Sequence, residues 1–160
     1  AATGGELILN NVLPEHLQPL TAKLSEIGAT IETGFDSIHI LGPEEISPVD
    51  IKTLPYPGFP TDMQAQMMAL LTVCKGTSIV TETVFENRFM HAAELRKMGA
   101  DIRIKGSSSV INGVSHLEAA SVESTDLRAG AAMVIAAQMA FPRSAACIIS
   151  NVVMKDLLKS

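Results

Sequence analysis

The sequence predicts an α/β fold in which a βαββ unit followed by a buried helix is repeated. Two observations support this prediction. The first is an internal repeat, because the apolar segment at residues 5–9 returns at residues 76–80, and Gly28 returns as Gly99, both 71 positions later. The second is composition, since 47% of the residues are hydrophobic and only 18% are charged. Such a chain buries a sizeable core, and a repeat of this period indicates that each copy is one supersecondary unit.

The first copy begins with a short apolar strand at residues 7–9. An amphipathic helix is predicted for residues 15–27, where leucines recur at helical spacing. Gly28 is placed to end this helix in the left-handed conformation. Two short strands, residues 29–33 and 37–41, complete the unit.

The second copy has the same order of elements. A strand is predicted for residues 78–82, and a helix for residues 88–98 that ends at Gly99. Two strands follow at residues 101–105 and 109–112. By sequence matching, the last strand is one residue out of step with its counterpart in the first copy.

Each copy continues through a loop and a short strand to a second helix. This helix begins at a Thr-Asp pair, residues 61–62 in the first copy and 125–126 in the second. Both residue types are favoured helix N-caps. Residues 67–73 and 129–140 are apolar on almost all faces, so we expect protein to surround both helices.

The domain organisation follows from the repeat. We expect a single partial domain, residues 1–160, with repeat one at 5–75, repeat two at 76–140 and a divergent or truncated tail at 141–160. No linker or charge run divides the chain. An unfinished third repeat would leave apolar helix surface unpaired, which favours self-association.

Charge and cysteine usage exclude several classes of protein. The net charge is −5 and no basic stripe is present, so nucleic acid is not an expected partner. Residues 129–140 are too short to span a bilayer, and residues 1–9 lack the features of a signal peptide. Cys74 and Cys147 are far apart and lie in apolar segments. We expect both to be reduced and buried, in a protein of the cytoplasm.

Three segments carry a resemblance to a known family. They are PTDMQAQ at residues 60–66, TETVFENRF at 81–89 and TDLRA at 125–129. In order and spacing they are similar to the second half of the UDP-N-acetylglucosamine 1-carboxyvinyltransferases. The similarity extends from about residue 3 to residue 140.

The resemblance implies both a fold and an activity. The family transfers the enolpyruvyl group of phosphoenolpyruvate to the 3-hydroxyl of UDP-N-acetylglucosamine, the first committed step of peptidoglycan synthesis. Its fold is an inside-out α/β barrel of βαβαββ-type units, with helices inside and sheets outside, as in EPSP synthase. The implied partners are the two substrates and a second domain of the same enzyme. No metal ligand set is apparent, and no cofactor is expected.

Asp62 resembles the family's aspartate that lies against the acceptor hydroxyl. A positioned carboxylate there can take the hydroxyl proton as general base. The alternative is that Asp62 only caps the helix that begins at Met63, as its repeat partner Asp126 would cap its own helix. Both roles are compatible.

Val84, Phe85 and Arg88 resemble positions of the nucleotide-sugar pocket, Val84 partly through its backbone. The alternative for Val84 is a core residue at a strand end. Arg88 falls in the first turn of the predicted helix, where the helix dipole disfavours a cation, and this favours a specific anionic partner. Its alternative is a salt bridge to Glu86 or Glu94.

Asp126, Leu127 and Arg128 resemble a family segment close to the reacting centre. Asp126 would handle protons or hold the active-site loops, with helix capping as the alternative. The family's Lys-Asn pair and loop cysteine, the target of fosfomycin, have no counterpart here, and Arg143 lacks the context of the family's phosphoenolpyruvate-binding arginine. We therefore expect little turnover from this chain alone.

Two alternatives to this function stay open. One is an enzyme like 5-enolpyruvylshikimate-3-phosphate synthase, against which the TETVFENRF segment at residues 81–89 argues. The other is a non-catalytic remnant that binds a sugar nucleotide, which the divergent tail and the missing domain favour.

Overall fold

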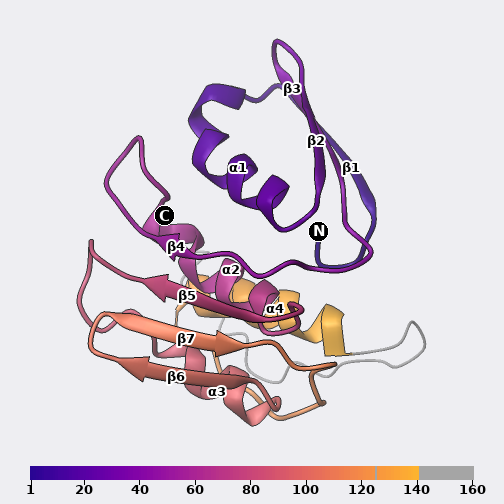
Figure 1. Cartoon of the computed structure of the whole chain (residues 1–160). Coiled ribbons are helices and arrows are strands. Elements are labelled where there is room, and N and C mark those ends of the chain that lie inside the picture. Colours follow the sequence, from indigo (N-terminus) through magenta and orange to yellow (C-terminus); the bar gives the residue numbers. More distant parts are fainter. Residues whose placement is uncertain (125, 141–160) are drawn as a thin grey trace, which may run out of the picture.

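The computed structural model describes residues 1–124 and 126–140, and it contains two sheets, each packed with helices (Figure 1). The first sheet has three antiparallel strands in the order β1-β3-β2, with α1 against one of its faces. Its elements are β1 (Glu6–Asn10), a 3-10 helix (Pro14–Leu17), α1 (Gln18–Glu26), β2 (Thr30–Thr33) and β3 (Ser37–Leu41).

The second sheet has four strands in the order β4-β5-β7-β6. β4 runs parallel to β5, and the other neighbours are antiparallel. The helices α2, α3 and α4 lie behind this sheet in Figure 1. The elements are β4 (Ile51–Lys52), a 3-10 turn (Thr61–Met63), α2 (Gln64–Leu71), β5 (Thr77–Thr81), α3 (His91–Lys97), β6 (Asp101–Lys105), β7 (Ser108–Asn112) and α4 (Leu127–Ala140).

The strand registers of the two sheets repeat at the offset found in the sequence. Leu9 pairs with Ile38 in the first sheet, and Val80 pairs with Ser109 in the second. Both partners in the second pair lie 71 positions after those in the first. The expected one-residue step in the last strand is therefore wrong. The β6–β7 hairpin turns over the same number of residues as the β2–β3 hairpin, so β7 begins at Ser108.

The first predicted helix, residues 15–27, is present in two parts. A 3-10 helix that starts at Pro14 leads into α1, which begins at Gln18. Gly28 follows with φ of 106°, in the left-handed region that the prediction required.

The second predicted helix, residues 88–98, is shorter than expected. α3 begins only at His91, because residues 86–90 form turns and Asn87 takes a positive φ of 56°. Arg88 therefore does not lie in the first turn of a helix, and the dipole argument made for it is wrong. A left-handed residue cannot continue an α-helix, which explains the late start.

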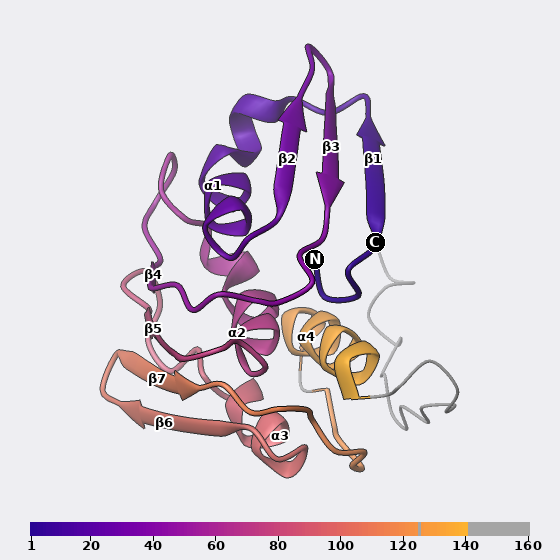
Figure 2. The same cartoon turned by 45° about the vertical axis from the view of Figure 1, so that its right-hand side comes forward.

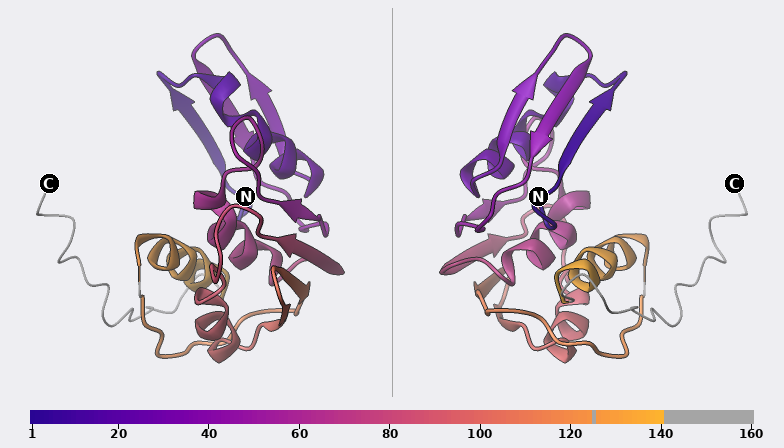
Figure 3. Two further views of the ribbon diagram at one scale, coloured as in Figure 1. Left: turned by 90° about the vertical axis from the view of Figure 1, so that its left-hand side faces the viewer. Right: turned by 90° about the vertical axis from the view of Figure 1, so that its right-hand side faces the viewer.

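α2 is surrounded by protein, as its composition predicted. Met68 and Leu71 are completely buried, and they pack in the core with Ile111 and Leu117. In Figures 2 and 3 the helix lies between the four-stranded sheet and α4. Cys74, just after α2, is a buried free thiol, as expected. Cys147 lies outside the described residues.

α4 differs from this expectation. Ala132, Met133 and Ala136 are buried, whereas Leu127 is 71% exposed and Val134 is 42% exposed. α4 packs against α2 and α3 with one face, and no described element covers its other face. The expectation that protein surrounds this helix is therefore wrong for the described part of the chain.

Gly113 directly follows β7 and lies against the backbone of the segment after α2. A Cβ atom at this position would lie 1.7 Å from the carbonyl oxygen of Cys74. The next residue, Val114, donates its N–H to the carbonyl of Thr72 at 2.8 Å. Only glycine permits this close backbone approach, so the site-bearing helix is held at a fixed place against the sheet.

The described residues include no helix with enough length and hydrophobicity to cross a membrane.

Candidate active site

The Asp62 side chain stands on the 3-10 turn that leads into α2. Pro60 precedes this turn in an extended conformation. No side chain caps either the turn or α2, so the expectation that Asp62 caps this helix is wrong. The side chain of Asp62 is 66% exposed, and its carboxylate is directed to other partners.

Two guanidinium groups bind this carboxylate. The Nε of Arg128 lies 2.6 Å from Asp62 Oδ1, and the Nη1 of Arg88 lies 3.3 Å from the same oxygen. Arg128 comes from the first turn of α4, and Arg88 from the turn before α3. The structure thus brings together three of the predicted site residues from segments far apart in the sequence.

The electrostatic effect on Asp62 is clear in direction. The hydrogen bond from Arg128, together with the charges of Arg128 and Arg88, lowers the pKa of Asp62, and these effects outweigh the opposing effect of burial. Asp62 is therefore ionised at neutral pH. Its second oxygen, Oδ2, makes no hydrogen bond with the described residues, and it remains open to a ligand hydroxyl.

Asp126 does cap its helix, as predicted. Its Oδ1 accepts the backbone N–H groups of Arg128 at 2.8 Å and Ala129 at 3.0 Å. These are two of the N–H groups that the start of α4 would otherwise leave unpaired. The cap fixes the first turn of α4 and with it the backbone of Arg128. Leu127, between the two, is largely exposed.

A groove runs beside Arg88 and has a volume of about 570 Å³. It is within the usual size range of small-molecule sites. Val84 and Phe85 line it, and the guanidinium of Arg88 lies 4.1 Å from the centre of the Phe85 ring. This cation–π contact orients Arg88 along the groove wall.

The structure does not support the alternative roles considered for Val84 and Arg88, which were a core position and a salt bridge to Glu86 or Glu94. Val84 is half-buried in a turn and is not a core residue. Its N–H donates to Glu82 at 2.8 Å. Arg88 binds Thr61 and Asp62, and neither Glu86 nor Glu94 is among its partners in the described part of the chain.

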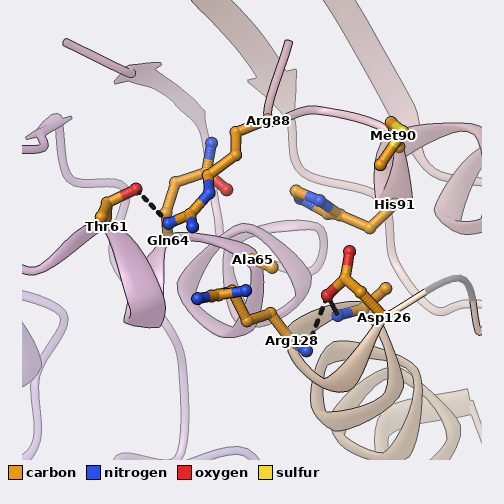
Figure 4. Close-up of a pocket in the computed structure, with 9 residues that line it drawn as sticks. Thr61, Gln64, Ala65, Arg88, Met90, His91, Asp126 and Arg128 are labelled. Carbon is orange, nitrogen blue, oxygen red and sulfur yellow. Dashed lines mark hydrogen bonds between the residues drawn. The ribbon is translucent and has the colours of Figure 1, made fainter. Parts of the chain in front are cut away.

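A second, much smaller cavity is lined in part by Arg88 and Arg128 themselves (Figure 4). Its volume of about 30 Å³ accommodates one or two water molecules and no substrate. Gln64 and His91 line it, together with Asp126. The Nε2 atom of Gln64 is buried and has no hydrogen-bond partner among the described residues. Burial lowers the pKa of His91 to about 4, so this ring is neutral at physiological pH.

Sequence reasoning missed Glu82, a buried carboxylate that holds the groove together. A signal was available, because Glu82 directly follows β5 and continues the two-residue spacing of Ser78 and Val80. The structure buries all three residues. A Glu on the buried face of a strand is rare unless it is hydrogen-bonded. Among the described residues, no group of three or more His, Cys, Asp or Glu side chains is arranged to hold a metal ion.

Comparison with known proteins agrees with this architecture. The family described as EPSP synthase (3-phosphoshikimate 1-carboxyvinyltransferase) matches residues 1–152. The chain belongs to the EPSP synthase family. The crystal structure of the enolpyruvyl transferase NikO from Streptomyces tendae resembles this one with a TM-score of 0.75 and 22% identity, over 86% of this chain and 34% of that chain. This likeness confirms the predicted fold class.

Curated relatives are more similar in sequence. UDP-N-acetylglucosamine 1-carboxyvinyltransferase 1 of Caldanaerobacter subterraneus is 55% identical over 144 residues, which are 90% of this chain and 35% of the relative. UDP-N-acetylglucosamine 1-carboxyvinyltransferase 2 of Clostridium tetani is 58% identical over 135 residues, or 84% and 32%. UDP-N-acetylglucosamine 1-carboxyvinyltransferase of Desulfofundulus thermocisternus is 54% identical over 140 residues, or 88% and 58%. The chain thus spans between about a third and three fifths of these relatives.

Proposed function

We propose that this chain is part of an enzyme that transfers the enolpyruvyl group of phosphoenolpyruvate to the 3-hydroxyl of UDP-N-acetylglucosamine, in peptidoglycan synthesis. The observation that carries the proposal is the meeting of Asp62, Arg88 and Arg128 on one carboxylate oxygen, beside a groove of ligand size. Each of the three residues comes from a different segment of the family resemblance. The names of the relatives support the same acceptor substrate.

Asp62 is the proposed catalytic residue. In the addition, the acceptor oxygen bonds to C2 of phosphoenolpyruvate, its proton passes to Asp62 Oδ2, and C3 takes a proton from an acid that the proposed second domain would supply. In the elimination, the bond between C2 and the bridging oxygen breaks, the phosphate leaves with that oxygen, and C3 returns its proton to the same group as the double bond forms again. Asp62 then releases its proton to solvent. Because the two arginines lower the pKa of Asp62, they also weaken it as a base. An anionic substrate competes for these guanidiniums, and that competition raises the basicity of the carboxylate again.

The other predicted residues have binding and supporting roles in this proposal. Val84 and Phe85 form the wall of the groove against which the nucleotide sugar packs, and Arg88 binds its phosphate groups. Arg128 binds anionic groups at the reacting centre, and Asp126 fixes the backbone of Arg128 through the helix cap. Leu127 covers the ligand with its exposed side chain.

We further propose that residues 1–160 are one partial catalytic domain, with repeats at 5–75 and 76–140. The second domain of the same enzyme would close the other side of the cleft and supply the remaining phosphoenolpyruvate contacts. On its own, this chain would bind the sugar nucleotide with little or no turnover. The cytoplasm is the proposed compartment.

The alternative acceptor is a shikimate phosphate, which the family description itself suggests. A non-catalytic sugar-nucleotide-binding protein is the second alternative. The first alternative differs from the main proposal in the ligand that binds. The second differs in whether the longer protein catalyses the transfer.

Calorimetric titration of the chain with UDP-N-acetylglucosamine tests the proposal. We expect binding that Asp62→Ala weakens by about tenfold or more, the loss of one charged hydrogen bond. Asp36→Ala, at an exposed hairpin turn away from the groove, is the matched control and should bind like the original chain. A folded chain that binds shikimate 3-phosphate instead, or that is indifferent to Asp62→Ala, would contradict the proposal.

A further inference from the structure

Glu82 is a buried carboxylate at the end of β5, only 3% exposed. Four donors surround it. Its Oε1 accepts from Thr53 Oγ1 at 2.8 Å, Val84 N at 2.8 Å and Phe85 N at 3.1 Å. Its Oε2 accepts from Thr61 Oγ1 at 2.8 Å. Such saturation is what a buried carboxylate needs to remain charged.

These donors come from three separate segments of the chain. Thr53 follows β4, Thr61 begins the turn that carries Asp62, and Val84 and Phe85 form the groove wall. One carboxylate therefore ties the wall of the groove to the turn that presents the catalytic aspartate. No other side chain among the described residues bonds to all three segments.

The Thr61 hydroxyl extends this link to the ion cluster. It donates its hydrogen to Glu82 and accepts a hydrogen bond from Arg88 Nη1 at 2.8 Å. Figure 4 shows the Thr61–Arg88 contact. A hydroxyl has a single hydrogen, so the anionic Glu82 fixes the direction of that hydrogen and leaves the oxygen lone pairs for Arg88. The same guanidinium then reaches Asp62.

We propose that Glu82 is a positioning residue for the nucleotide-sugar site, which sets the distance between the Val84–Phe85 wall and Asp62 and orients Arg88 through Thr61. The inference rests on the proposed function, because it assumes that a nucleotide sugar occupies the groove lined by Val84, Phe85 and Arg88, next to Asp62. Glu82 lies in the lining of the groove but is only 3% exposed, and in this proposal it acts on the ligand through Val84, Phe85 and Thr61.

The charge state of Glu82 fits this role. Burial raises its pKa, but the hydrogen bonds from Thr53, Thr61, Val84 and Phe85 outweigh that effect and leave the pKa below its ordinary value. The carboxylate is therefore ionised throughout the neutral range, and the network does not switch near pH 7.

Glu82→Gln separates positioning from folding. The amide oxygen can replace Oε1 and keep the three bonds to Thr53, Val84 and Phe85, whereas the amide nitrogen replaces Oε2 and is itself a donor. The Thr61 hydroxyl then loses its acceptor, and its orientation toward Arg88 is no longer imposed. Thr61→Val breaks the same link from the other side, and Thr61→Ser retains the hydroxyl.

Glu94→Gln is the matched control. Glu94 is a half-buried carboxylate of α3 that also accepts a backbone N–H, from Glu123, and pairs with Lys97. It does not line the groove. If replacing any hydrogen-bonded carboxylate lowers stability, Glu94→Gln should show the same loss of stability, while its binding of the sugar nucleotide stays unchanged.

The test is calorimetric binding of UDP-N-acetylglucosamine to the full chain, together with NMR of the ligand-free chain. We expect Glu82→Gln and Thr61→Val each to weaken binding by about tenfold, with no further loss in the double variant. Thr61→Ser and Glu94→Gln should bind normally. In the ligand-free spectrum, Glu82→Gln should shift the Asp62 carboxylate and Arg88 side-chain resonances.

Two outcomes would overturn the inference. One is binding by Glu82→Gln equal to that of the original chain. The other is additive losses in the double variant, which would show that Glu82 and Thr61 act separately. Failure of the original chain to bind the sugar nucleotide would instead defeat the proposed function, and unshifted Asp62 and Arg88 resonances would then defeat the coupling as well.

Discussion

Asp62 and Asp126 begin equivalent helices in the two repeats, yet they bind different groups. Asp126 accepts two backbone N–H groups of α4 and acts as a helix cap. Asp62 accepts none from α2 and instead holds the side chains of Arg88 and Arg128. The aspartate of one Thr-Asp pair therefore caps a helix, whereas the aspartate of the other caps none and has its carboxylate available to bind side chains and ligand.

The helices themselves differ in the same sense. α2 is enclosed, with Met68 and Leu71 completely buried, whereas α4 exposes Leu127 and Val134 along one side. The first helix thus forms the centre of the described core, and the second lies at its boundary. Substitutions of apolar residues in the two helices should therefore have unequal effects on stability.

The largest difference is expected between two leucines. Leu71→Ala, in α2, should lower the free energy of unfolding by about 2–5 kcal/mol, because it leaves a cavity in a close-packed core. Leu127→Ala, in α4, should lower it by less than about 0.5 kcal/mol, since the side chain is already exposed. Urea denaturation measures both. Equal losses would show that the exposed side of α4 is covered in solution.

The next difference is expected between two glycines at equivalent positions. Gly113→Ala should cost about 3 kcal/mol, because its Cβ would meet the Cys74 carbonyl in the middle of the fold. At Gly42 a Cβ would lie 2.9 Å from the Cα of Gly4, near the start of the chain, where the backbone yields more easily. We expect about 1 kcal/mol there. Thermal unfolding decides the order, and a reversed order would be inconsistent with the close approach described at Gly113.

The two aspartates should differ in what they contribute: Asp126 mainly to stability, and Asp62 mainly to ligand binding. Asp126→Ala should lower the free energy of unfolding by about 1 kcal/mol through the lost cap, and Asp126→Asn should restore most of it. Asp62→Ala should change stability by less than about 0.5 kcal/mol, because exposed ion pairs contribute little. If Asp62→Ala proved the more destabilising, Asp62 would be a structural residue after all.

The smallest effect concerns pH. The folded pKa of Asp62 lies below its ordinary value, so its ion pairs stabilise the fold above that ordinary value. This contribution disappears as the pH falls through the folded pKa. In Arg128→Ala, the pKa of the Asp62 carboxyl should rise toward its ordinary value. The free energy of unfolding should then decrease slightly less steeply as the pH falls into the acid range. Carbon-13 NMR of the side-chain carboxyl follows this titration, with Lys97→Ala as an ion-pair control.

The repeat and the main strands could be predicted from the sequence, because apolar spacing is a local signal and the repeat shows as a 71-residue offset. The short strand expected before the second helix of each copy is present in the first copy as β4, but the described residues between β7 and α4 contain none, so that expectation is wrong for the second copy. The meeting of Asp62 with two arginines could be anticipated only through the family resemblance. Glu82 was missed because its importance depends on donors from three distant segments. The start of α3 was misplaced because the left-handed turn at Asn87 has no strong signature, and the exposure of α4 depends on neighbours beyond its own sequence.

The carboxylate of the ion cluster belongs to the first copy of the unit, and both guanidiniums belong to the second. The positions in the first copy that match Arg88 and Arg128 hold Leu17 and Gln64. Neither copy of this chain therefore holds all three charged groups, and the cluster forms only where the two copies meet.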